Sequence, residues 1–69
     1  MPVDWVYASG STWISFDAAA QVVIESLWQR GDSATWITCS NFPGPVYIDT
    51  HDMVVLYGSY SYTIARRSY

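Results

Sequence analysis

The histidine of this chain lies in a turn-like stretch that also carries two carboxylates. Asp49, His51 and Asp52 fall within four consecutive positions, and a histidine beside a carboxylate can serve as a general base or as a weak metal site. Neighbouring turn residues do not all point the same way, however, and Asp is an ordinary turn former. We therefore expect residues 50–52 to form an exposed turn with no catalytic role and no bound metal.

Cys39 is the single cysteine, and a thiolate assisted by His51 would be a nucleophile. The residue sits in a strand-like segment, where a lone cysteine commonly packs as a small apolar side chain. One cysteine allows no disulfide within the chain and supplies too few ligands for a structural zinc site. Neither a glycine-rich phosphate loop nor a serine-elbow pattern occurs. The sequence thus predicts that the chain is not an enzyme and carries no cofactor.

A glutamate interrupts the most apolar run of the chain, AQVVIESLW at residues 20–28. Apolar residues recur there at the spacing of one helix face, at Ala20, Val23, Ile24, Leu27 and Trp28. Glu25 falls off this face, so helix propensity and contact with solvent account for it. Between the helix and the sheet we expect a core that includes Trp13, Ile24, Leu27 and Trp28.

Composition narrows the classes of partner. The chain of 69 residues has a net charge of −3, contains no lysine and is 17% aromatic. A non-specific nucleic-acid binder needs many cations on phosphates, so that class is disfavoured. No segment reaches the roughly 18 apolar residues of a membrane span, and no signal-like segment begins the chain. We expect no membrane partner and a location in the cytoplasm or nucleus.

The first half of the chain predicts two strands and a helix. Residues 4–8 are rich in aromatic and β-branched residues, and residues 12–16 alternate in the manner of a half-buried strand. Asp17 can cap the start of a helix, and Gly31 can cap its end in a left-handed conformation. The helix is therefore expected at about residues 17–30.

The second half switches to the pattern of strands, predicted at residues 34–39, 46–49, 53–57 and 60–66. Gly58-Ser59 separates the last two, with glycine first, as a type II′ hairpin prefers. Two strands, a helix and about four strands predict an α+β fold. Its single domain, residues 1–69, would pack one helix on a curved antiparallel sheet of about six short strands.

Trp5, Trp13 and the Ile24-Glu25 pair match in order and approximate spacing the two tryptophans and the glutamate that name the WWE domain. The match continues through four further stretches, namely Phe16, Ile48-Asp49, Met53 and Ile64 to Arg67. The chain therefore resembles a WWE domain over nearly its whole length. The resemblance implies a binding module found in ubiquitin ligases and ADP-ribosyltransferases, which recognises the iso-ADP-ribose unit of poly(ADP-ribose) or a terminal ADP-ribose.

The resemblance also implies where a ligand would bind. Aromatic side chains would contact the adenine while an arginine and hydroxyl groups hold the phosphates, and the candidates here are Phe16, Tyr47, Tyr57, Tyr62 and Arg66. Val46, Val55 and Tyr62 stand where the family has a tyrosine, a glutamine and an arginine. Because neutral donors bind phosphate less strongly than charged ones, we expect weak recognition, in the high micromolar range or weaker.

The tyrosines near the end of the chain support an alternative. Tyr60 and Tyr62 share a strand face, Tyr57 can lie near Tyr60 across the hairpin, and Tyr69 follows. Tyrosine is enriched at interfaces because it is both apolar and hydrogen-bonding. The alternative is a divergent WWE-like domain that no longer binds ADP-ribose. It would be a protein-interaction or scaffold module within a larger protein of a ubiquitin-ligase or ADP-ribosyltransferase system.

Overall fold

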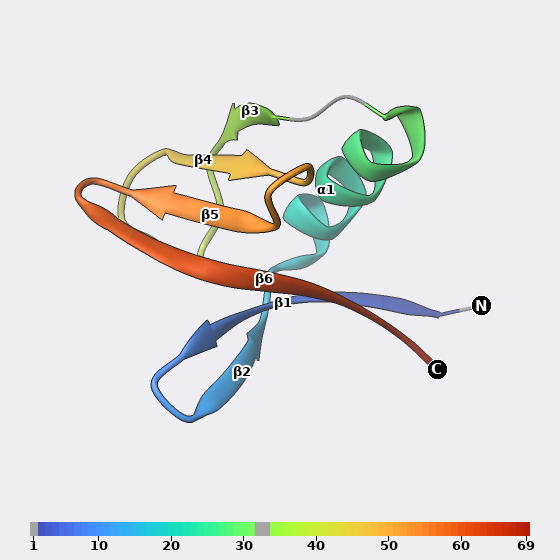
Figure 1. The fold of residues 1–69 in the computed structure, drawn as a ribbon, viewed down its shortest axis with the longest axis horizontal. Coiled ribbons are helices and arrows are strands. Elements are labelled where there is room, and N and C mark those ends of the chain that lie inside the picture. The colour runs from blue at the N-terminus through green and yellow to red at the C-terminus, as the bar shows by residue number, and fades with distance from the viewer. Residues whose placement is uncertain (1, 32–33) are drawn as a thin grey trace.

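The computed structural model describes residues 2–31 and 34–69. Within them, one helix packs on a six-stranded antiparallel sheet (Figure 1), which confirms the predicted α+β fold. Every element lies within two residues of its predicted limits. In chain order the elements are β1 (Val3–Ser9), β2 (Thr12–Ser15), α1 (Ala18–Arg30), β3 (Ala34–Ile37), β4 (Val46–Asp49), β5 (Val54–Tyr57) and β6 (Tyr60–Ser68).

Helix α1 begins and ends at the predicted caps. The Asp17 carboxylate accepts a hydrogen bond from the backbone N–H of Ala20 at 2.9 Å, which satisfies an amide of the first turn. Gly31 follows the helix with φ +80°, a left-handed conformation that suits glycine because it has no Cβ. The part of the chain that the structure describes holds no helix long and apolar enough to cross a membrane.

Strand β6 holds the two halves of the sheet together. The order is β2-β1-β6-β5-β4-β3. The first residues of β6 pair with β5, from Tyr60 to Thr63, and its later residues pair with β1, from Ile64 to Ser68. The long, bent course of β6 is visible in Figure 1, where the two chain ends lie on the same side of the molecule. Strands β2 and β3 are left as the two edges.

The β5–β6 hairpin has the predicted turn. Gly58 has φ +57°, whereas Met53 is the one non-glycine residue with positive φ among the described residues, so Ser59 does not share this conformation. Positive φ at the first loop position alone distinguishes type II′ from type I′. The turn brings Tyr57 and Tyr60 opposite each other, as expected.

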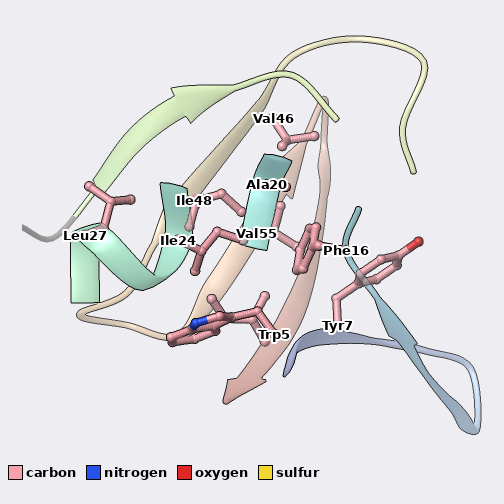
Figure 2. Close-up of a cluster of buried hydrophobic side chains, with 10 residues drawn as sticks. Trp5, Tyr7, Phe16, Ala20, Ile24, Leu27, Val46, Ile48 and Val55 are labelled. Atoms are coloured by element: carbon pink, nitrogen blue, oxygen red, sulfur yellow. The ribbon is translucent and has the colours of Figure 1, made fainter. Parts of the chain in front are cut away.

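The core lies between α1 and the sheet. Figure 2 shows side chains from α1 facing those of β4 and β5, with Trp5 of β1 beside them. Trp5 and Ile24 are fully buried and Leu27 nearly so, so the core positions predicted for Ile24 and Leu27 are confirmed. The buried apolar residues that form this core are Trp5, Tyr7, Phe16, Ala20, Ile24, Leu27, Val46, Ile48, Val55 and Ile64.

Two of the predicted core residues are not buried. Trp13 is 47% exposed and Trp28 is 45% exposed. Trp13 shares a face of β2 with Ser15, and the inward face belongs to Ile14, because successive side chains of a strand point to opposite sides. Trp28 lies at the flank of α1, where it covers the edge of Trp5 at a ring-centroid distance of 6.3 Å. It shields the core without filling it.

Candidate functional site

Glu25 is at the centre of a hydrogen-bonded network, so the expectation that it merely faces solvent is wrong. It accepts a bond from the indole Nε1 of Trp5 at 2.8 Å. The guanidinium of Arg66 donates to both of its oxygens, from Nε at 2.9 Å and from Nη2 at 2.8 Å. Gln29 adds a fourth bond at 2.6 Å. A carboxylate bound in this two-pronged manner is held firmly in one orientation.

The pairing of β1 with β6 explains why Trp5 and Arg66 meet at Glu25. The two residues are directly opposite in the ladder. The backbone N–H of Trp5 instead bonds Gln21, and its C=O accepts from the backbone of Phe16. Trp5 and Arg66 therefore form a non-hydrogen-bonded pair, in which side chains approach most closely. Both side chains then reach the same helix residue.

The network also fixes the charges of its members. Hydrogen bonding from Arg66 lowers the pKa of Glu25 from 4.5 to about 2, with smaller contributions from Trp5 and Gln29, while burial acts in the opposite direction. The same pair raises the pKa of Arg66. The guanidinium of Arg66 also stacks over the ring of Trp28, 4.1 Å from its centroid. Arg66 is thus occupied on its edge by Glu25 and on its face by Trp28.

Asp4 forms a second polar centre on β1. It accepts hydrogen bonds from Arg67 at 2.9 Å and from Gln21 of α1 at 2.9 Å, and the bond from Arg67 is the main reason that the pKa of Asp4 is lowered. Arg66 and Arg67 are successive residues of β6, so they use opposite faces of the strand: Arg66 reaches Glu25 of the helix and Arg67 pairs with Asp4. Both arginines of the last strand are therefore in ion pairs.

Five aromatic rings meet on the inner side of the sheet, in what we call the aromatic cluster: Tyr7, Phe16, Phe42, Tyr57 and Tyr62. Phe42 is central, with ring-centroid distances of 5.0 Å to Tyr7, 5.4 Å to Tyr57 and 5.6 Å to Tyr62. Tyr7 contacts Phe16 at 5.1 Å and Tyr62 at 5.9 Å. These separations are those of packed aromatic pairs. The rings pack against one another at tilted or edge-on angles.

The structure brings three of the five predicted ligand-binding residues together and places two elsewhere. Phe16, Tyr57 and Tyr62 belong to the aromatic cluster. Tyr47 lies on the outer face of β4 and packs edge-on against Trp36 of β3 at 5.2 Å. Arg66 is four residues beyond Tyr62 along β6, about 13 Å at the rise of a strand, and is paired with Glu25.

The turn around His51 has the geometry of an ordinary Asx turn. The Asp49 carboxylate accepts the backbone N–H of His51 and of Asp52, each at 2.9 Å. The His51 side chain is 80% exposed and lies 3.1 Å from Asp52, so its predicted exposure is confirmed. Thr50 is only 9% exposed, and its predicted exposure is wrong. Asp49, His51 and Asp52 could offer ligand atoms within 4.8 Å of one another, but the backbone bonds already account for the arrangement.

Cys39 was expected in a strand at residues 34–39, but β3 ends at Ile37, so Cys39 follows the strand. Its side chain is partly buried and packs against the core, in agreement with the expected apolar role.

An open groove of about 1050 Å³ runs between α1 and the edge strand β3, and we call it the α1–β3 groove. Val22 on the helix is 71% exposed and Trp36 on the strand is 65% exposed. The groove is lined by Ala19, Ala20, Val22, Val23, Ser26, Leu27, Arg30, Ala34, Thr35, Trp36, Ile37, Thr38 and Pro45.

A smaller groove of about 430 Å³ lies on the other side of α1, next to Trp5 and Glu25. None of the five predicted ligand-binding residues lines either groove. Sequence reasoning missed Phe42 because it lies in a turn-rich connection, and it missed the α1–β3 groove because the pattern of a helix does not show which strand lies beside it. The adjacent Val22 and Val23 could have indicated the groove, because a helix that buries one stripe leaves at least one of two successive valines exposed.

Two of the three residues that define the WWE resemblance, Trp5 and Glu25, are in direct contact, and the third, Trp13, is on the surface. The contact gives the Glu25 position a structural reason, because the buried indole N–H of Trp5 needs an acceptor. Comparison with known proteins found no family model, no curated protein and no solved structure that matches this chain.

Proposed function

We propose that this chain is a non-catalytic binding module, similar to WWE domains, that recognises another protein. The observation that carries the proposal is the α1–β3 groove, with Val22 exposed on its helix side and the edge strand β3 on the other, where the Trp36 ring is exposed on the outer face of the sheet. Exposed large apolar side chains beside a hollow are typical of interaction surfaces. In this proposal the module belongs to a larger protein of a ubiquitin-ligase or ADP-ribosyltransferase system in the cytoplasm or nucleus, which the WWE resemblance supports.

The state of Arg66 favours a protein partner over a phosphate-bearing one. Its Nε and Nη2 donate to Glu25, and one face of its guanidinium stacks on Trp28. A diphosphate would have to replace a carboxylate that already satisfies the same fork of N–H groups. Arg67 donates from Nη2 to one oxygen of Asp4. The acidic net charge of −3 adds a general repulsion toward phosphates.

The aromatic cluster supports the same choice. Phe42 enters from the β3–β4 connection and packs against Tyr7, Tyr57 and Tyr62. An adenine needs a free ring face on which to stack, and these rings already pack against one another within the protein. Val46 and Val55, which stand at two family polar positions, are fully buried in the core.

Weak recognition of an ADP-ribose-type ligand is the second candidate. The observation that favours it is the meeting of Phe16, Tyr57 and Tyr62 in one cluster. A ligand would have to displace Phe42 and draw its phosphate contacts from tyrosine hydroxyls and backbone amides. Such neutral donors support affinity in the high micromolar range or weaker.

Titration with ADP-ribose and iso-ADP-ribose, followed by two-dimensional ¹H–¹⁵N NMR, separates the two candidates. The protein-recognition proposal predicts that the amide signals of the aromatic cluster stay in place at millimolar ligand. Saturable shifts at residues 16, 57 and 62, abolished in Tyr62→Ala and retained in the exposed control Tyr60→Ala, would replace it with the second candidate.

A further inference from the structure

The outer face of the sheet carries an apolar row that crosses β3, β4 and β5. Trp36, Tyr47 and Leu56 are directly opposite one another in the ladder, so their side chains project to the same face. The rings of Trp36 and Tyr47 meet at 60° with their centroids 5.2 Å apart. Because Trp36 is 65% exposed, most of its π surface is accessible to a ligand.

Two carboxylates adjoin this row. Asp49 is two residues beyond Tyr47 on the same face of β4, and it is diagonal to Trp36 across the ladder, at about 7–8 Å between Cα atoms. A carboxylate oxygen of Asp49 and one of Asp52 lie within 4.8 Å of each other, and neighbouring like charges favour a cation beside them. Both backbone bonds that Asp49 accepts end on Oδ1, so Oδ2 can accept from a ligand.

The chain itself shows what a ring and a carboxylate hold together. Arg66 stacks over Trp28, 4.1 Å from the ring centroid, and donates to Glu25 from Nε and Nη2. The guanidinium uses its face for the ring and its edge for the carboxylate, so the two interactions do not compete. A tryptophan ring with a carboxylate beside it is therefore a site for a guanidinium in this protein.

A second arginine repeats the combination on the outer face. Arg67 lies 6.0 Å from the ring centroid of Tyr69 and donates to Asp4. The chain has three arginines and no lysine, and the third, Arg30, belongs to α1, which packs on the other face of the sheet. A cation for the Trp36 ring thus has to come from another molecule. The net charge of −3 favours the approach of a cationic one.

We propose that Trp36, Tyr47 and Asp49, which we call the outer-face site, bind an arginine side chain of a partner protein. The guanidinium stacks on the Trp36 ring and donates to Asp49, while the methylenes of the arginine lie along Leu56. Arginine fits better than lysine because its planar group stacks and donates at the same time. The site is separate from the α1–β3 groove, so this inference goes beyond the function proposed above.

The test uses a display library of heptapeptides with a fixed central arginine and random flanks. The library is first depleted on Trp36→Leu, which removes peptides that bind elsewhere, and is then selected on the native chain. A synthetic copy of an enriched peptide should give NOEs from the arginine methylenes to the ring protons of Trp36. A copy with citrulline, the neutral analogue of arginine, should bind about tenfold or more weakly. A copy with lysine should bind about threefold more weakly.

Charge-matched variants test the carboxylate. Asp49→Asn keeps an oxygen that can accept the two backbone bonds of the turn, so it should keep the melting temperature and weaken the peptide about fivefold or more. Ser11→Lys makes the same change in net charge in the exposed turn between β1 and β2 and should leave the affinity within about twofold. Added salt should weaken binding to the native chain more than binding to Asp49→Asn.

A matched aromatic variant tests the ring. Trp13 is exposed on β2, at the opposite edge of the sheet from β3. Trp13→Leu should bind the peptide as the native chain does. An equal loss in Trp13→Leu would show that the peptide contacts exposed tryptophans without a defined site, and the inference would be wrong.

Three other results would overturn the inference. The first is a library that yields no enriched peptide. The second is a citrulline copy that binds as tightly as the arginine copy, because Trp36 would then be an apolar contact only. The third is a set of NOEs to the methyl groups of Val22 and Val23. That last result would support the protein-recognition role of the α1–β3 groove, whereas failure at the outer-face site alone leaves that role standing.

Discussion

The two flanks of α1 carry different kinds of residue, and they differ in how far the rest of the chain covers them. One flank, which we call the closed flank, carries Gln21 and Glu25; their side chains bond to β1 and to Arg66 of β6 and leave the smaller groove beside them. The other flank carries Val23 and Ser26 and opens into the α1–β3 groove. The polar flank is thus the one that packs, and the more apolar flank is the one left accessible.

The sheet order accounts for this difference. Strands β1 and β6 pair with each other inside the sheet, so the opposed side chains of Trp5 and Arg66 can both reach Glu25. Strand β3 is an edge strand of four residues with small or β-branched neighbours around its single large ring, Trp36. A helix flank is closed by what the neighbouring strands can supply, and hydrophobicity of the flank itself is not sufficient.

Replacing the buried anchor of the closed flank should have the largest effect. Trp5→Ala removes a fully buried indole and should lower the free energy of unfolding by about 3–5 kcal/mol. The control is Trp36→Ala on the edge strand β3, expected to cost less than about 1 kcal/mol because the ring is mostly exposed. Urea unfolding measures both. Equal losses would mean that Trp5 is no better packed than a surface ring.

Removing the charge of Glu25 should have the next largest effect. Glu25→Gln keeps the shape of the side chain but leaves Arg66 without a carboxylate and weakens the bond to the Trp5 indole. We expect a loss of about 2 kcal/mol in the free energy of unfolding. Ser26→Ala, the adjacent residue on the open flank, should change it by less than about 0.5 kcal/mol. If Glu25→Gln leaves the free energy of unfolding unchanged, the network orients the side chains without stabilising the fold.

Lowering the pH should weaken the interaction of Glu25 with Arg66, and with it the fold, within a defined pH range. The pKa of Glu25 is about 2 in the folded chain, against 4.5 for a glutamate without these partners. Because the folded pKa is the lower one, the stabilisation is fully present above about pH 4.5 and is lost as the pH falls toward 2. The loss should be about 1–2 kcal/mol after screening by solvent. Unfolding curves of the native chain and Glu25→Gln should converge over this range, and parallel curves would contradict the assignment.

Removing Trp28, which covers Trp5, should have the smallest effect on stability. Trp28→Ala removes a half-exposed ring that contacts Trp5 edge-on, so we expect a cost of about 1 kcal/mol. This is well below the 3–5 kcal/mol that typifies a core tryptophan. A loss in that higher range, measured by thermal unfolding, would place Trp28 in the core after all.

The local structure was predictable from the sequence because it depends on neighbours along the chain. Asp17 and Gly31 limit α1 through backbone groups within the first and last turns. Gly58 sets the hairpin through its own φ angle. The alternation within residues 12–16 marked one strand, and the order of strands around one helix left few arrangements other than an antiparallel sheet.

The tertiary structure alone decided which side chains meet. Glu25 contacts Trp5 and Arg66, which lie 20 and 41 residues away along the chain. Phe42 enters the aromatic cluster from a turn, and Trp28 and Trp13 leave the core although their types suit it. Periodicity gives the direction of a side chain relative to its own helix or strand, but the partner depends on strand order and register. Residues with the same local pattern can therefore end in a closed network or beside an open groove.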